Sequence, residues 1–186
     1  MFDAILVAAA ELLEREGTDF TLAQVAARAG VAAGSFYQYF PDRRALVAAL
    51  IDRQLAHDRA QLAEFRSLSS VTPDALPDLL VSGVLRLYGA RPKSMAAMVA
   101  LLHELGRDGD VRALSEEFCG ALSDHLQRQQ VTRAADDCLG AARAAVFALL
   151  GIVRQAVTED PEKLAGDPAF RERLVTVARA ALSSAG

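Results

Sequence analysis

The chain has 186 residues, 52% of them hydrophobic, and a formal net charge of −4. Such a chain can bury a sizeable core, but its negative charge argues mildly against nucleic-acid binding by the molecule as a whole. The most apolar run, Ala144 to Val153, is far shorter than the roughly 20 residues of a membrane span, and no signal peptide is visible. We therefore expect a soluble, cytoplasmic protein without a membrane segment.

The distribution of helix-breaking residues predicts an all-α fold. Glycine and proline are few and spaced, alanine is abundant, and runs of β-branched residues are absent. All six prolines fall where a helix would begin or end, a pattern that does not suit long strands. We expect about nine helices.

Capping residues bound the first two predicted helices. An amphipathic helix runs from near Asp3, which would cap it, to Gly17. A second helix starts at Thr21, because Thr21 and Gln24 have the spacing of a capping box. Gly30 then stands where a left-handed residue commonly ends a helix, so the chain is expected to turn sharply there.

A short helix from about Ala33 to Tyr39 is predicted after that turn. Phe36 and Phe40 lie one turn apart and are expected to face the preceding helix, which leaves the tyrosines exposed. Pro41 ends this helix, and Asp42 is a good cap for the next one. Two helices joined by a few residues including glycine are typical of a helix-turn-helix unit, whose second helix enters the major groove of DNA.

The segment Thr21–Leu46, TLAQVAARAGVAAGSFYQYFPDRRAL, resembles the DNA-binding signature of the TetR (tetracycline-repressor-like) family. The matching positions are Thr21, Val25, Ala26, Ala29, Gly30, Val31, Gly34, Ser35, Phe36, Tyr37, Tyr39, Phe40, Pro41 and Leu46. Two positions depart from the family pattern, which often has Ser in place of Ala32 and Lys in place of Arg43. The resemblance implies a homodimeric transcriptional repressor that binds a palindromic operator and is released by a small apolar ligand.

The same resemblance implies a DNA-binding domain over residues 1–46 and places a set of its side chains on double-stranded DNA. The set consists of Thr21, Ala32, Ala33, Gly34, Ser35, Tyr37, Gln38, Tyr39 and Arg43. Most of them would position the protein on the DNA backbone. Ala33 and Gln38 are expected to read base edges, the alanine through a thymine methyl group and the glutamine by pairing with adenine. Between Arg28 and Leu46 three arginines stand against Asp42 alone, so this segment can be locally positive.

Residues 47–186 are expected to form a larger helical domain for effector binding and dimerisation. The apolar pattern from Asp42 to Phe65 predicts one long connecting helix, followed by a polar break over residues 67–74. Further helices are predicted over residues 76–88, from residue 92 up to Gly106, and over residues 111–130, 133–157 and 168–182, with a turn at residues 108–110.

The middle helices combine aromatic, sulfur-containing and polar side chains, a mixture that suits an apolar ligand pocket. For any one of these residues an ordinary core position is the alternative. The candidate pocket residues are Phe65, Leu85, Tyr88, Met95, Met98, His103, Phe118 and Phe147.

The last two predicted helices are apolar over more than one face, as a subunit interface requires. Gly140 and Gly151 lie inside the first of them, which favours a close approach of another helix. The alternative is that both helices are buried within their own domain. The candidate dimer residues are Leu139, Val146, Leu150, Gly151, Val153, Phe170, Leu174, Val177 and Ala181.

Other functions find less support in the sequence. No nucleophile elbow, phosphate-binding loop, HExxH motif or paired metal-ligand spacing is present, so no catalytic residue, metal site or cofactor is assigned. Cys119 and Cys138 are expected to be small buried residues of a reducing cytosol, with a redox switch as the alternative. A helical protein whose helix-turn-helix contacts another protein, and a DNA-binding regulator without a ligand, stay open as alternatives.

Overall fold

The structure is a computed structural model that describes residues 1–68, 71–129, 134–160 and 167–183. Over these residues the chain forms nine α-helices and no strand, which confirms the expected all-α fold. The helices are α1 (Phe2–Glu16), α2 (Leu22–Ala29), α3 (Ala33–Tyr39), α4 (Arg43–Ser67), α5 (Leu76–Gly89), α6 (Pro92–Glu104), α7 (Asp108–Gln129), α8 (Ala135–Glu159) and α9 (Pro168–Ser183).

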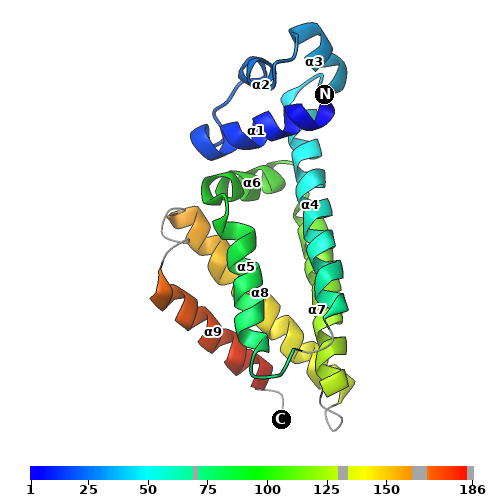
Figure 1. The fold of residues 1–186 in the computed structure, drawn as a ribbon, viewed down its shortest axis with the longest axis vertical. Helices are drawn as coiled ribbons and strands as arrows, with labels where there is room; N and C mark the ends of the chain where they lie inside the picture. Colours follow the sequence, from blue (N-terminus) through cyan, green and yellow to red (C-terminus); the bar gives the residue numbers. More distant parts are fainter. Residues whose placement is uncertain (69–70, 130–133, 161–166, 184–186) are drawn as a thin grey trace.

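The molecule is elongated, and α4 connects its two ends (Figure 1). Helices α1, α2 and α3 form one end, and α4 runs from them along α7 through the larger part of the protein. Helix α8 packs between α7 on one side and α9 on the other, and α5 packs on α8 and α9. Helix α6 lies across the others and packs against α1, so the small helical unit rests on the larger one through α4 and α6.

The predicted capping box and left-handed turn define α2. Thr21 is the N-cap: its Oγ1 accepts a hydrogen bond from the Gln24 backbone N–H at 3.2 Å, and Gln24 Oε1 accepts one from the Thr21 N–H at 2.6 Å. Gly30 has φ 65° and ψ 30°, and the N–H of Val31 donates to the carbonyl of Ala26 at 3.0 Å. The chain therefore reverses at Gly30, and the carbonyls of Ala26 and Ala27 in the last turn of α2 are paired by the N–H groups that follow.

Two buried phenylalanines fix α3 beside this turn. Phe36 is fully buried and Phe40 is 2% exposed, as predicted from their spacing. Asp42 caps α4, since its Oδ1 accepts from the N–H of Ala45 at 2.8 Å. The prediction of one long helix after this cap is confirmed, and its buried residues are Leu46, Val47, Leu50, Ile51, Leu55, Leu62 and Phe65.

Several predicted boundaries were wrong. Residues 108–110 form the first turn of α7 instead of a separate turn, because two aspartates there suit the positive end of a helix. Met1 stands at the N-cap of α1 in place of Asp3, whereas α5 ends at Gly89, within one residue of the predicted end at residue 88. A Cβ atom added at Gly140 or Gly151 would meet nothing within 4 Å, so no close helix contact within the protomer explains either glycine. The expected boundaries at residues 130 and 133 lie outside the described residues.

We predict that Gly30→Ala lowers the free energy of unfolding by about 1 kcal/mol, because the Cβ atom of alanine is sterically disfavoured at positive φ. A Cβ atom at Gly30 meets no neighbour within 4 Å, so the cost is one of backbone conformation alone. Gly34→Ala is the matched control, since Gly34 lies within α3 and its Cβ would also meet nothing. Urea unfolding of both variants checks this, and equal stability of the two would contradict the proposed turn.

Candidate functional site

The end of the molecule formed by α3 presents a set of uncovered side chains, which we name the reading face. It consists of Ala32, Ala33, Gly34, Ser35, Tyr37, Gln38 and Tyr39. Tyr37 and Tyr39 are 49% and 44% exposed, and only Ser35 among the set is half-buried. Thr21 is exposed at the start of the neighbouring helix α2. Figure 1 shows this end pointing away from α5 to α9, so the rest of the protomer does not cover it.

Aromatic contacts on the buried side of α3 hold the reading face in place. The ring of Phe2 in α1 stacks on Phe40 at 5.2 Å between centroids and meets Tyr39 edge-on at 6.2 Å. The ring of Tyr37 meets the buried Phe36 edge-on at 5.6 Å. Each tyrosine thus has one side against the core of the small unit, and its hydroxyl group makes no hydrogen bond with a described residue.

Arg43 makes contacts inside the protomer that the sequence did not predict. Its Nη1 donates to the carbonyl oxygen of Phe20 at 2.8 Å, and its Nη2 donates to that of Thr18. The guanidinium group also lies 4.6 Å from the centroid of the Phe20 ring. These contacts hold the turn between α1 and α2 against the start of α4. Arg43, which was expected to contact a DNA phosphate, therefore positions this turn in the structure.

The positive charge near the reading face is smaller than the count of arginines suggests. Arg28 forms an ion pair with Glu11 of α1, at 2.6 Å from Nε to Oε2. Arg44 is exposed at the start of α4 and forms no ion pair with a described residue. Arg44 is therefore the arginine of this segment whose charge stays available to an anion.

The larger unit encloses a cavity of about 390 Å³ between α4, α5, α6, α7 and α8. Five of the predicted pocket residues line it, namely Phe65, Tyr88, Met95, Met98 and Phe118. Most of the other lining side chains are leucine and valine. A cavity of this volume and polarity is of the kind that binds small organic molecules.

Three predicted pocket residues lie elsewhere. Phe147 is 39% exposed on the outside of α8. The side chain of His103 is 87% exposed and pairs with Asp108, at 3.1 Å from Nδ1 to Oδ2. Leu85 does not line the cavity. Val84 and Tyr88, which are four residues apart on α5 and share one face of it, do. Residue type alone did not give the direction of these three side chains.

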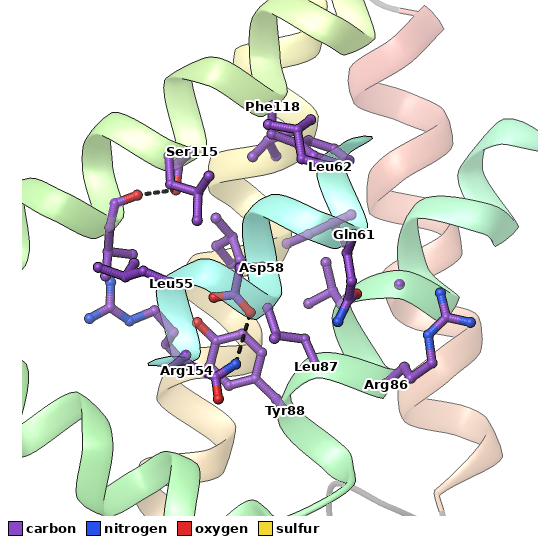
Figure 2. A pocket seen from close by; sticks show the side chains of 18 of the residues that line it. Leu55, Asp58, Gln61, Leu62, Arg86, Leu87, Tyr88, Ser115, Phe118 and Arg154 are labelled. Atoms are coloured by element: carbon purple, nitrogen blue, oxygen red, sulfur yellow. Dashed lines mark hydrogen bonds between the residues drawn. The ribbon is translucent and has the colours of Figure 1, made fainter. Parts of the chain in front are cut away.

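The cavity also has polar side chains that were not predicted from the sequence. Figure 2 labels several of them, among them Asp58 and Gln61. Gln54, Asp58 and Gln61 of α4 lie on the same helical stripe as the buried Leu55 and Leu62, a spacing that could have indicated them. Gln54 Nε2 donates to Asp58 Oδ1 at 2.8 Å.

Burial changes the acidity of two groups in the cavity. It raises the pKa of Asp58, although the hydrogen bond from Gln54 and the charge of His57 partly oppose the change. It also raises the pKa of Tyr88 to about 12, with Arg154 lowering and Asp58 raising that value to a smaller extent. Tyr88 therefore stays a neutral hydroxyl group between two side chains of opposite charge.

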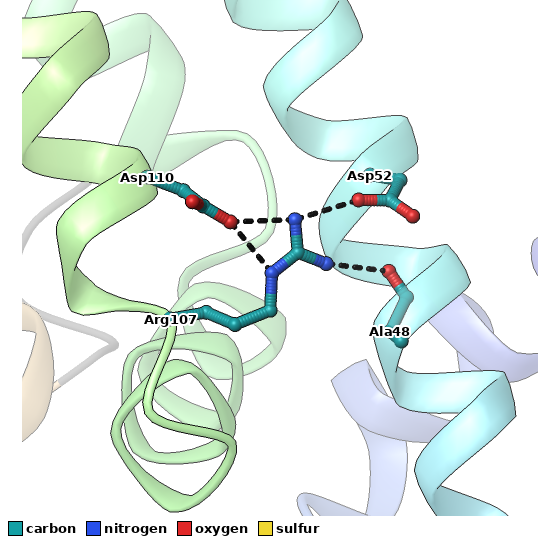
Figure 3. Close-up of polar contacts among 4 residues, drawn as sticks. All are labelled: Ala48, Asp52, Arg107 and Asp110. Atoms are coloured by element: carbon teal, nitrogen blue, oxygen red, sulfur yellow. Dashed lines mark hydrogen bonds and ion pairs between the residues drawn. The ribbon is translucent and has the colours of Figure 1, made fainter.

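Arg107 ties the corner between α6 and α7 to α4 (Figure 3). Its Nη2 lies 2.7 Å from Asp52 Oδ1 and 2.6 Å from Asp110 Oδ2, and its Nη1 donates to the carbonyl of Ala48 at 3.3 Å. Hydrogen bonds with Asp52 and then Asp110 raise the pKa of Arg107 above its ordinary value. The tie is made in the second and third turns of α4, close to the small helical unit.

A second contact joins the two parts through α6. The N–H of Ser94, in the first turn of α6, donates to Oε2 of Glu14 in α1 at 2.7 Å. The side chain of the N-cap residue Arg91 does not cap α6. The carboxylate of Glu14 in α1 caps the helix instead. Met95, Met98 and Leu102 of the same helix line the cavity.

The predicted dimer residues do not all lie on the surface. Val146, Val153 and Leu174 are 6%, 0% and 1% exposed within their own protomer, so they are corrected to core positions. Leu150 is half-buried and lines the cavity together with Val146. The others lie at or near the surface: Gly151 is exposed, and Leu139, Phe170, Val177 and Ala181 are half-buried.

The outer side of α8 carries exposed apolar and small residues, of which only Gly151 was among the predicted dimer residues. Phe147 and Ile152 are 39% and 38% exposed, and Ala144 and Gly151 lie exposed beside them. Helix α9 packs along α8, so the two helices present a joint surface. A dimer surface on α8 and α9 stays a prediction, and three of these exposed residues, Ala144, Phe147 and Ile152, were not among the residues predicted for it.

No helix among the described residues is long and apolar enough to cross a membrane. In the same part of the chain no three His, Cys, Asp or Glu side chains are grouped as a metal site would need. Cys119 and Cys138 are both fully buried, and burial raises the pKa of the Cys119 thiol to about 11. A thiol of this kind is poorly reactive at neutral pH.

Comparisons with known proteins agree with this architecture. A family model described as "Bacterial regulatory proteins, tetR family" matches residues 5–50. A second model, described as "Tetracyclin repressor-like, C-terminal domain", matches residues 72–182. A comparison with curated proteins gave no match.

Solved structures share the fold over nearly the whole length. A TetR transcriptional regulator from Rhodococcus sp. RHA1 is 21% identical, covers 100% of this chain and 97% of its own, and has a TM-score of 0.61. A TetR-family transcriptional regulator from Mesorhizobium loti MAFF303099 is 14% identical, with coverage of 98% and 93% and a TM-score of 0.69. GusR from Salmonella enterica is 19% identical, with coverage of 98% and 94% and a TM-score of 0.61.

The matches of the two family models fall on the two structural parts described above, the small helical unit with its reading face and the larger unit with its cavity. Together they span most of the chain, and the protein therefore belongs to the TetR family of DNA-binding transcriptional regulators.

Proposed function

We propose that the protein is a cytoplasmic transcriptional repressor that binds a palindromic operator as a homodimer and is released by a small, largely apolar ligand. The observation that carries the proposal is the exposure of the reading face at one end of the molecule, on a helix whose core side is fixed by Phe36 and Phe40. A rigid, uncovered second helix of a helix-turn-helix unit is the arrangement that docks in a major groove.

Small residues at the start of α3 let its backbone approach the groove wall. Ala33 and Gln38 are the residues we assign to base edges, and the hydroxyl groups of Tyr37 and Tyr39 to phosphates. We assign the phosphate contact first expected of Arg43 to Arg44, because Arg43 already donates to two carbonyl groups of its own protomer. Such a small basic surface fits a protein that gains affinity by binding two half-sites at once.

The dimer is proposed to form through α8 and α9. The exposed Phe147 and Ile152 supply apolar area on α8, and Phe170 and Val177 supply part-buried area on α9. A two-fold axis through this surface makes the interface self-complementary, so that every contact between two residues of the pair occurs twice. It also leaves α3 at the opposite end of each protomer free for DNA.

Release of the protein from DNA is proposed to depend on α4 and α6, each of which has one side lining the cavity. Helix α4 continues from the cavity wall to the small unit, and Arg107 fastens it to the α6–α7 corner. Helix α6 is capped by Glu14 of α1. A ligand that shifts either helix changes the position of α1, and hence of the reading face, relative to the larger unit.

We expect Gly34→Leu to weaken operator binding by at least roughly a hundredfold, because a large side chain at the start of α3 would hold the helix off the groove. The fold should tolerate the change, since a Cβ atom there meets nothing within 4 Å. Gly109→Leu is the control: Gly109 is also an exposed helical glycine with open space, in α7. Fluorescence anisotropy with a selected DNA duplex measures both, and normal binding by Gly34→Leu would rule out the docking pose.

Phe147→Glu should weaken dimerisation at least tenfold, because a charge would be buried at the proposed interface. Val7→Glu is the matched control, since Val7 has the same exposure of 39% but lies on α1 at the other end of the protein. Light scattering during size-exclusion chromatography over a dilution series reports the dissociation. If both variants dissociate at the same concentration as the parent protein, the interface lies elsewhere.

A further inference from the structure

Asp58 places a carboxylate on the wall of a cavity that is otherwise largely apolar. It lies on α4 between Leu55 and Leu62, which line the same cavity. Figure 2 shows the carboxylate pointing into the space between the helices, next to the hydroxyl group of Tyr88. Neither the fold nor the reading face requires an acid at this position.

The protein partly satisfies this carboxylate. Gln54 Nε2 donates to its Oδ1 at 2.8 Å, and Oδ2 has no hydrogen bond with a described residue. No described Lys, Arg or His forms an ion pair with it. His57, the residue that precedes Asp58 on α4, affects the pKa of Asp58 only by its charge and does not line the cavity.

None of the other charged groups that line the cavity forms an ion pair with Asp58, although one of them, Arg154, is half-buried. The charge of Arg154 lowers the pKa of Tyr88, whereas the charge of Asp58 raises it. Figure 2 places the guanidinium group of Arg154 beyond the hydroxyl group of Tyr88. Arg86 and Glu64 line the cavity with exposed side chains of opposite charge. The one half-buried acid among the lining residues is therefore Asp58, with Tyr88 as a neutral neighbour.

A carboxylate held away from water without a counter-ion is costly, and a bound cation removes that cost. The raised pKa of Asp58 has the direction expected of such a group. An anionic ligand would be repelled by this carboxylate, and a neutral ligand would leave it unpaired. The cavity thus discriminates between ligands by charge as well as by size.

We propose that the effector is a small hydrophobic cation, an amine or a quaternary ammonium compound, whose nitrogen lies against Asp58 while its hydrocarbon part fills the apolar cavity. This rests on the effector role proposed for the cavity and adds the chemical class of the ligand. A cavity of about 390 Å³ fits a molecule of ordinary drug size. An ammonium group with N–H bonds can also donate to the Tyr88 hydroxyl oxygen.

The test uses the full chain and four probes with the same alkyl chain: a primary amine, a trimethylammonium salt, an alcohol and a carboxylic acid. Calorimetric titration is expected to show tighter binding of the two cations than of the alcohol, and weakest binding of the acid. Asp58→Asn should weaken binding of the cations by roughly tenfold or more and leave that of the alcohol unchanged. Asp124→Asn, which removes an exposed carboxylate of α7 outside the cavity, should change neither.

Tighter binding of the acid than of the amine would overturn the proposal, as would equal losses for the amine and the alcohol in Asp58→Asn. Circular dichroism of each variant shows whether it is folded, and Asp58→Glu, which keeps the charge, should retain preference for cations. Operator release is measured separately with the same probes. Cations that bind through Asp58 without releasing DNA would leave the ligand class standing and contradict the proposed mode of regulation.

Discussion

The continuity of α4 is the constraint on which the rest of the molecule depends. Its 25 residues correspond to about 37 Å of unbroken helix. Near its start Leu46 and Leu50 are buried beside α1, and farther along Asp58 and Phe65 line the cavity. Because a helix transmits displacement along its axis better than a loop does, α4 mechanically connects the cavity to the small unit that carries the reading face.

Two polar contacts determine how this element is held. Arg107 binds α4 at Ala48 and Asp52, on the side of the small unit, and Glu14 caps α6 from α1. The Glu14 contact crosses between the units, whereas the Arg107 contact holds α4 near the small unit, and both α4 and α6 also form part of the cavity wall. A cation on Asp58 would therefore act two turns along α4 from the Arg107 tie. Such short paths through packed helices are a physical basis for coupling between two sites.

The sequence predicted those features that depend on neighbouring residues. The capping box at Thr21, the turn at Gly30 and the burial of Phe36 are local, and the structure confirms each of them. The direction of a side chain within a bundle depends on how helices far apart in sequence pack, which explains why Phe147 was placed in the cavity and Asp58 was missed. The inward contacts of Arg43 likewise require the α1–α2 turn to lie beside α4, a tertiary contact that no local pattern contains.

The most direct test of the account is selection of bound duplexes from a random DNA pool by the full chain. The account predicts enrichment of symmetric sites whose two half-sites lie roughly one helical turn apart, about 34–36 Å from centre to centre or a multiple of it, because two copies of α3 must occupy grooves on one face of the duplex. Enrichment of single, asymmetric sites would contradict the two-fold assembly, and a pool that stays random would contradict the assignment of α3 as the DNA-reading helix.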